Sequence, residues 1–143
     1  MKQLITIATI LFISLNIQAQ NWLTNIDEAG KIAKNENKKI ILSFQGSDWC
    51  APCIKLNHDF FSTEEFKKYA KEHFVMLKVD FPRRKKNRLS KEQQKHNNQL
   101  AEKYNQNGYF PLVVVLDKNL KVLQQTSYKD ISVTDFIKLL DPK

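Results

Sequence analysis

The chain has little cysteine, and after its first 19 residues it has no long apolar run. Cys50 and Cys53 are its only two cysteines among 143 residues. A bridge between them would close a loop of only four residues. Such a short loop removes little entropy from the unfolded chain, so a mainly structural role is disfavoured. No histidine follows Cys53, which excludes covalent haem attachment through Cys-x-x-Cys-His.

Long apolar segments are also missing from residues 20–143. A membrane-spanning helix needs roughly 20 apolar residues, and every run in this part of the chain is shorter. We therefore expect no stable membrane span there. No internal repeat and no long linker divides these residues, and their number suffices for one domain with its own core.

The N-terminal segment has the layout of a secretory signal peptide. A positive start at Lys2 precedes a mostly apolar run from Leu4 to Leu15, and the small residue Ala19 follows. The run is too short for a typical membrane anchor, although an uncleaved signal anchor remains an alternative. We predict a signal peptide over residues 1–19, cleavage after Ala19, and a periplasmic or otherwise exported domain over residues 20–143.

The most informative feature of the chain is the spacing of its two cysteines. Cys50 and Cys53 follow Trp49, where an apolar strand is predicted to turn into a helix. Two thiols three residues apart face each other across one helical turn, near enough to form a small disulfide ring. The helix start also favours a thiolate on the first cysteine, because unpaired N–H groups point towards it. This pattern indicates a reversible dithiol–disulfide switch.

Apolar periodicity and capping patterns predict the secondary structure of residues 20–143. A Ser or Thr with an acid or Gln three residues later predicts a helix start, at Thr24, Ser62, Ser90 and Ser132. A further short helix should run from Cys50 to about Asn57. Short apolar runs, several of them β-branched, predict strands over 39–44, 74–80, 112–116 and 121–126.

The order of these elements predicts an α/β architecture. Helices join the first two strands, which should therefore lie parallel through a right-handed crossover. The last two strands are joined by a short turn and should form an antiparallel hairpin. We expect one mixed central sheet with helices on both faces.

With these elements in place, the chain resembles the thioredoxin family. The resemblance is carried by the motif Trp49-Cys50-Ala51-Pro52-Cys53, the segment Tyr109-Phe110-Pro111-Leu112, the strands beside them, and the hairpin with the last helix. Together these pieces span nearly all of residues 20–143. The form Phe44-Gln45-Gly46-Ser47-Asp48-Trp49-Cys50 is similar to small exported thioredoxin-like proteins of bacteria.

The resemblance implies a thioredoxin-like fold and the activity of a thiol–disulfide oxidoreductase. Cys50 would be the exposed nucleophile that forms a mixed disulfide, and Cys53 would resolve it. The partners would be proteins with disulfides or dithiols, together with an upstream redox partner. No cofactor and no metal ion is implied, and the direction of electron transfer is left open.

The resemblance also assigns substrate contacts. Pro111 matches the family's cis-proline, which would bring the backbone of Phe110 beside the cysteines to pair with an incoming peptide strand. Trp49 would lie near the thiols on the partner-contacting surface, and Pro52 would shape the helix start. A trans proline that merely begins a strand, and a tryptophan in the core, are the alternatives.

Two features depart from the family pattern. Many thioredoxins bury a carboxylate in the strand before the motif, whereas this chain has Ser43 there and no acid from Lys38 to Ser47. Asp48 is close in sequence but is interpreted as a solvated turn residue. The second departure is a basic stretch over 81–91, without acids, which should share a sheet edge with Cys50.

The basic stretch has several interpretations. It would favour the Cys50 thiolate and attract acidic partners, or it would be a mobile, solvated loop that only aids solubility. Nucleic-acid binding is not expected, because the run lacks interleaved aromatic residues.

A metal carrier, for example for copper, is the alternative function. It would use Cys50 and Cys53 together with His58, which follows them closely. A thioredoxin-fold binding module with little turnover belongs to the same alternative.

Overall fold

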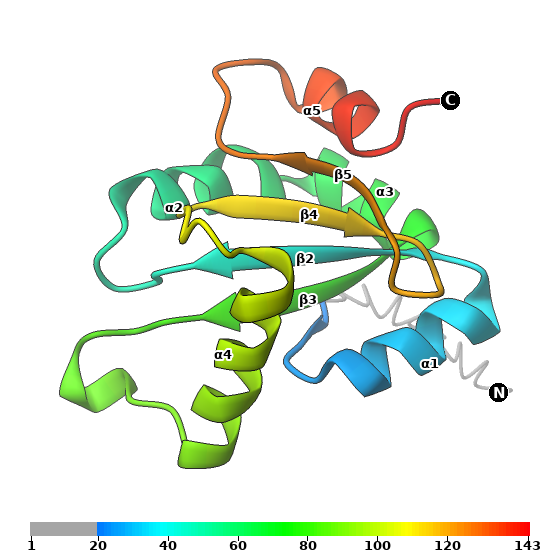
Figure 1. The fold of residues 1–143 in the computed structure, drawn as a ribbon. Coiled ribbons are helices and arrows are strands. Elements are labelled where there is room, and N and C mark those ends of the chain that lie inside the picture. The colour runs from blue at the N-terminus through cyan, green and yellow to red at the C-terminus, as the bar shows by residue number, and fades with distance from the viewer. Residues whose placement is uncertain (1–19) are drawn as a thin grey trace, which may run out of the picture.

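The computed structural model describes residues 20–143 (Figure 1). The predicted signal peptide over residues 1–19 lies outside the described residues. The elements are β1 (Trp22–Leu23), α1 (Ile26–Glu36), β2 (Lys39–Gln45), α2 (Ala51–Leu56), the π-helical η1 (Asn57–Phe61), α3 (Glu64–His73), β3 (Phe74–Asp80), the 3₁₀ turn η2 (Lys85–Asn87), α4 (Lys91–Tyr104), β4 (Leu112–Leu116), β5 (Val122–Thr126) and α5 (Val133–Leu140). Within this part of the chain, none of the helices has the length and apolar character that crossing a bilayer requires.

The five strands form one mixed sheet in the order β1-β3-β2-β4-β5. β3 pairs parallel with β2 and with β1, whereas β4 pairs antiparallel with β2 and with β5. The predicted parallel pair and terminal hairpin are thus confirmed. The edge strand β1 was not predicted, because two residues are too short to show a periodic pattern.

Helices cover both faces of the sheet, as expected for this architecture (Figure 1). Successive residues of β2 point to opposite faces. Leu42 joins the core under α1 and α4, while Ile41 joins the core under α2, η1, α3 and α5. The second core is rich in aromatic rings, and those of Phe60 and Phe136 stack with their centroids 4.1 Å apart. The sheet is therefore held rigidly from both sides.

Two of the predicted helix caps are confirmed and two are displaced by one residue. Ser90 and Ser132 cap α4 and α5 through their hydroxyl groups. Asn25, rather than Thr24, caps α1, and Thr63, rather than Ser62, caps α3. In both pairs the two neighbouring residues are good caps, so the local pattern alone does not select between them.

Strand pairing brings three separate segments to one edge of the sheet. Parallel strands end at the same edge, and Gln45 at the end of β2 is in register with Asp80 at the end of β3. The antiparallel strand β4 begins at this edge, because Leu112 pairs with Phe44. The cysteine motif, the basic stretch after β3 and the segment before β4 therefore meet there.

At the opposite end of the sheet, Asp141 ties the C-terminus to β2 and α3. Its carboxylate accepts a hydrogen bond from the Tyr69 hydroxyl at 2.6 Å and forms an ion pair with Lys39. Burial of the carboxyl raises its pKa, but the hydrogen bonds from Lys39 and Tyr69 outweigh this and leave the pKa of Asp141 below its usual value. The ionised group therefore stabilises the fold above the unfolded-state pKa, and this stabilisation is lost as the pH falls through the folded-state pKa.

We predict that Asp141→Asn lowers the free energy of unfolding by about 1 kcal/mol near neutral pH, because the charge-assisted bonds are weakened. The difference from the wild type should shrink as the pH falls below about 4, where the carboxyl becomes protonated. Urea unfolding between about pH 7 and about pH 2.5 measures this. The exposed residue Asp130, changed to Asn, is the matched control and should have little effect at any pH. A difference that does not depend on pH would contradict the prediction.

Candidate active site

Cys50 and Cys53 form a disulfide at the carboxyl edge of the parallel strands. Their sulfur atoms are 2.11 Å apart and their Cα atoms 5.2 Å apart. Both residues are buried, with 4% of Cys50 and 2% of Cys53 exposed. The expectation of an exposed Cys50 does not hold for this disulfide form, in which each sulfur covers part of the other. Burial alone does not distinguish the two cysteines.

The position of each cysteine in helix α2 does distinguish them. Cys50 is the N-cap residue, in an extended conformation, and its sulfur accepts a hydrogen bond from the backbone N–H of Cys53 at 3.3 Å. Cys53 lies inside the first turn. Pro52 is also in the first turn. N–H groups there have no acceptor within the helix, so the missing N–H of proline costs no helical hydrogen bond. A helix start with an N–H group aimed at sulfur favours a thiolate on Cys50 when the bridge is open.

Trp49 joins the cysteine motif to the segment after β3. Its indole Nε1 donates to the carbonyl oxygen of Phe81 at 2.7 Å, and its ring lies 5.6 Å from that of Phe110 between centroids. The guanidinium of Arg83 lies 3.8 Å from the centroid of the indole, a cation–π contact. Trp49 is half-buried in this position, so it belongs to the site rather than to either core.

Gly46 is a functional position that sequence reasoning missed. A Cβ atom at this residue would lie 2.2 Å from the Trp49 ring, so only glycine leaves room for the indole. The carbonyl oxygen of Gly46 also accepts hydrogen bonds from the backbone N–H groups of Trp49 and Cys50. A glycine directly after a buried strand was the available sequence signal, since such a glycine often marks a close backbone approach.

The segment before β4 forms the other wall of the site. The Phe110–Pro111 peptide bond is cis, as the resemblance implied. Buried Asn105 holds the neighbouring Tyr109, because its side chain accepts from the N–H of Tyr109 and donates to its carbonyl oxygen, both at 2.9 Å. The Tyr109 side chain remains 59% exposed. Sequence analysis did not identify this role of Asn105.

Asp48 is a partly exposed turn residue, as the sequence suggested, but it also holds the segment after β3. Its carboxylate accepts hydrogen bonds from the backbone N–H of Arg83 at 2.9 Å, the backbone N–H of Arg84 at 3.0 Å and the Asn87 amide at 2.9 Å. These bonds, the one from the Arg83 backbone first, hold the pKa of Asp48 below its usual value. A second contact runs in parallel, because the Ser47 N–H and hydroxyl both donate to Asp80. The cysteine motif and the basic stretch are thus bonded together.

The surroundings of Cys53 contain no carboxylate from β2. Ser43 occupies the expected position, is fully buried, and its hydroxyl has no hydrogen-bond partner among the described residues. Its register partner on β3 is Lys78. A cavity of about 240 Å³ adjoins Cys53, and the residues lining it include Gln45, Asn57 and Lys78. Polar side chains and one amine therefore lie on the open side of Cys53, where thioredoxins of the usual pattern have a buried acid.

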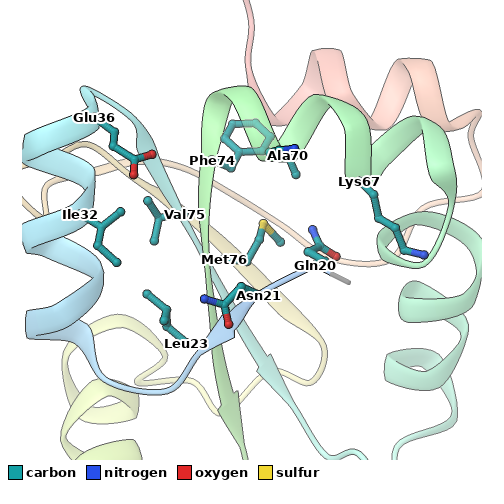
Figure 2. A pocket seen from close by; sticks show the side chains of 11 residues that line it. Gln20, Asn21, Leu23, Ile32, Glu36, Lys67, Ala70, Phe74, Val75 and Met76 are labelled. Atoms are coloured by element: carbon teal, nitrogen blue, oxygen red, sulfur yellow. The ribbon is translucent and has the colours of Figure 1, made fainter. Parts of the chain in front are cut away.

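A separate cavity of about 270 Å³ lies at the amino end of β3, away from the cysteines (Figure 2). Gln20 and Met76 lie on its floor, and Ile32 of α1 and Lys67 of α3 flank it. It contains no cysteine and has no part in the disulfide site.

His58 does not gather with the cysteines. Its side chain is 86% exposed, and its Nδ1 lies 2.8 Å from the Asp59 carboxylate. Asp59 also accepts hydrogen bonds from Lys55 and Tyr128. Among residues 20–143, no cluster of three or more His, Cys, Asp or Glu side chains has a geometry that could hold a metal ion.

This fold and this cysteine pair together define a thioredoxin-fold protein with a Cys-x-x-Cys disulfide. The chain belongs to the thioredoxin-like family, because residues 21–118 match the family model described as "Thioredoxin-like". The predicted family and fold are thereby confirmed.

Comparison with individual proteins gives the same result. The chain is 38% identical over 102 residues to the disulfide bond reductase DsbH of Chlamydia pneumoniae. The aligned region covers 71% of this chain and 60% of DsbH. It is 30% identical over 92 residues to the thioredoxin-related protein DsbJ of the same organism, covering 57% of this chain and 26% of DsbJ. A solved structure described as "DsbH Oxidoreductase" superposes with a TM-score of 0.79 at 30% identity and covers 88% of both chains.

We predict that Asp48→Ala releases the basic stretch from the cysteine motif without unfolding the protein. The backbone amides of Arg83 and Arg84 would lose their acceptor, so their hydrogen exchange should become at least about tenfold faster. Amide exchange followed by NMR or mass spectrometry measures this. Asp117→Ala is the matched control, because Asp117 accepts two backbone N–H groups in a remote turn. Unchanged exchange at Arg83 and Arg84 would show that Asp48 does not hold the segment.

Proposed function

We propose that the protein is an exported thiol–disulfide oxidoreductase that reduces disulfides of partner proteins through Cys50 and Cys53. The observation that carries the proposal is a disulfide whose first sulfur caps a helix at the open edge of a thioredoxin-like sheet. Reduction is the direction favoured by the similarity to DsbH, a disulfide bond reductase. The electron donor that reopens the bridge would be an upstream dithiol protein.

Cys50 is the proposed nucleophile. As a thiolate it attacks one sulfur of the partner disulfide, forms a mixed disulfide and expels the partner's second sulfur as a thiolate, which takes up a proton. The N-cap position of Cys50 supports this role, because the Cys53 N–H is already directed at its sulfur.

Cys53 is the proposed resolving residue. Its thiolate attacks the Cys50 sulfur, and the bond between Cys50 and the partner breaks. The partner leaves with two electrons and two protons gained, and the Cys50–Cys53 disulfide forms. The cavity beside Cys53, which Lys78 also lines, gives this sulfur access to water for the loss of its proton.

The partner's peptide would lie across the cysteines, over a surface formed by Trp49 and Pro52 on the motif and by Phe110 and Pro111 before β4. The rings of Trp49 and Phe110 contact each other, and the backbone beside the cis Phe110–Pro111 bond could pair with an extended strand. Apolar contact area is available beside this surface, since Ile54 is 53% exposed and Tyr109 is 59% exposed. Exposed apolar residues next to a reactive site are typical of protein docking surfaces.

Export is part of the same proposal. The charged start, the apolar run and Ala19 support a cleaved signal peptide over residues 1–19, which leaves a thioredoxin-like domain over residues 20–143. A location outside the reducing cytoplasm also suits a protein whose substrates carry disulfides.

We predict that Cys50→Ser abolishes reduction of insulin disulfides, because no nucleophile remains. Cys53→Ser should also stop turnover but should trap mixed disulfides with partners, since nothing resolves them. Insulin turbidity and non-reducing gels with mass spectrometry measure the two outcomes. His58→Ala, a change of an exposed residue near the motif, is the control and should leave turnover intact. Trapping by Cys50→Ser instead would reverse the two roles.

We predict that the protein expressed with its full sequence is exported and begins at Gln20. Ala19→Arg should block the cut, because cleavage requires a small residue at this position. Intact mass measured on the periplasmic fraction distinguishes the forms, and Gln20→Ser, just beyond the cut, is the control. A periplasmic protein that keeps Met1 would indicate the uncleaved anchor instead.

A further inference from the structure

Five exposed basic side chains lie in the segment that follows β3 at the same sheet edge as the cysteine motif. We call them the basic rim: Arg83, Arg84, Lys85, Lys86 and Arg88. All five residues are exposed, and none of them forms an ion pair with an acidic side chain within residues 20–143. Their positive charge therefore faces solvent without neutralisation by close acidic partners.

The two acids closest to the rim do not cancel it. Asp48 accepts hydrogen bonds from the backbone N–H groups of Arg83 and Arg84 and from the Asn87 amide, and of the charged rim groups only Arg84 attracts it, weakly and without an ion pair. Asp80 accepts both hydrogen bonds from Ser47. The acids anchor the segment and leave the basic side chains directed outwards with a net positive charge.

The rim is held at a fixed place relative to the cysteines. Arg83 lies on the indole of Trp49, the residue before Cys50, and Trp49 also bonds to the Phe81 carbonyl. The 3₁₀ turn η2 (Lys85–Asn87) orders the middle of the segment. These contacts tie the segment to the cysteine motif and disfavour the interpretation as a mobile loop.

We propose that the basic rim docks acidic segments that flank the reactive disulfide of a partner protein. A partner strand lying across the cysteines would pass close to Arg83, which lies on the ring of Trp49, so acidic residues beside its cysteine would meet the rim. Fixed positive charge beside a reactive group raises the local concentration of oppositely charged substrates and speeds their association. This inference rests on the proposed function and specifies its substrate class.

The structure favours a protein partner over a single-stranded nucleic acid. Single-stranded nucleic acid is usually held by exposed aromatic platforms, whereas the nearest platform, Trp49, is already covered by Arg83. The same charges could act on the Cys50 thiolate instead. That effect would speed the reduction of every disulfide equally, whereas docking speeds only acidic substrates.

The test compares two disulfide peptides that differ only in the flanks of the disulfide, one with three Glu on each side and the other with three Ser. The rim variant changes Arg84, Lys85, Lys86 and Arg88 to Gln and keeps Arg83, which contacts Trp49. The control variant changes four lysines to Gln at the opposite end of the sheet, in α1 and the β4–β5 turn: Lys31, Lys34, Lys118 and Lys121. Both variants lose the same net charge.

The wild type and the control variant should reduce the acidic peptide about tenfold faster than the neutral one at low salt, judged by kcat/KM. The preference should weaken above about 0.1 M salt, where charges are screened beyond about 10 Å. In the rim variant the ratio should fall to within about twofold of one, with the neutral rate retained. An unchanged ratio in the rim variant, or an equal loss for both peptides, would overturn the proposal.

A binding experiment tests the docking role separately from the proposed reductase activity. The acidic peptide with Ser in place of both cysteines should quench or enhance tryptophan fluorescence of the wild type and should bind the rim variant at least fivefold more weakly. Binding without any reduction of either peptide would refute the proposed function alone. Equal binding to both proteins would refute the docking role, and rim-dependent binding to anionic vesicles without peptide binding would assign the rim to a lipid surface instead.

Discussion

The parallel pairing of β2 with β3 is the constraint on which the site depends. It places Gln45 level with Asp80, so the segments that follow both strands leave the sheet at the same edge. The antiparallel pairing of β4 with β2 then brings Pro111 to that edge from a third part of the chain. Because both faces of the sheet are covered by packed helices, the edge is held at a fixed geometry, and only side chains and short turns remain to adapt to a partner.

Two kinds of contact turn this edge into a reactive site. Asp48 bonds to the main chain of the basic stretch, and Trp49 bonds to Phe81 while carrying Arg83 on its ring. Gly46 makes this possible, because any larger residue would collide with the indole. A carboxylate in the turn before Cys50 thus holds the main chain of the basic stretch.

The sequence predicted much of this arrangement, and its failures have local causes. The bounds of β3 and β4 followed from compact apolar runs between clear breakers. Strand β1 was missed because two residues are too few to show an alternating apolar pattern. Thr24 was predicted as the helix cap in place of Asn25 because the two adjacent residues have similar capping preferences. The bonds of Asp48 to the basic stretch were missed because its partners lie more than 30 residues away, and no local pattern records a hydrogen bond of that kind.

The sequence alone determined the chemistry: two cysteines at one-turn spacing behind a strand, with a proline between them at a helix start. Spacing and helix-start electrostatics are local properties, so they can be read from adjacent residues. Only the tertiary structure decided what surrounds those sulfurs. The meeting of Trp49, Arg83 and Phe110 depends on strand register and on a crossover between distant segments, and non-local pairing of this kind leaves no mark in any short stretch of sequence.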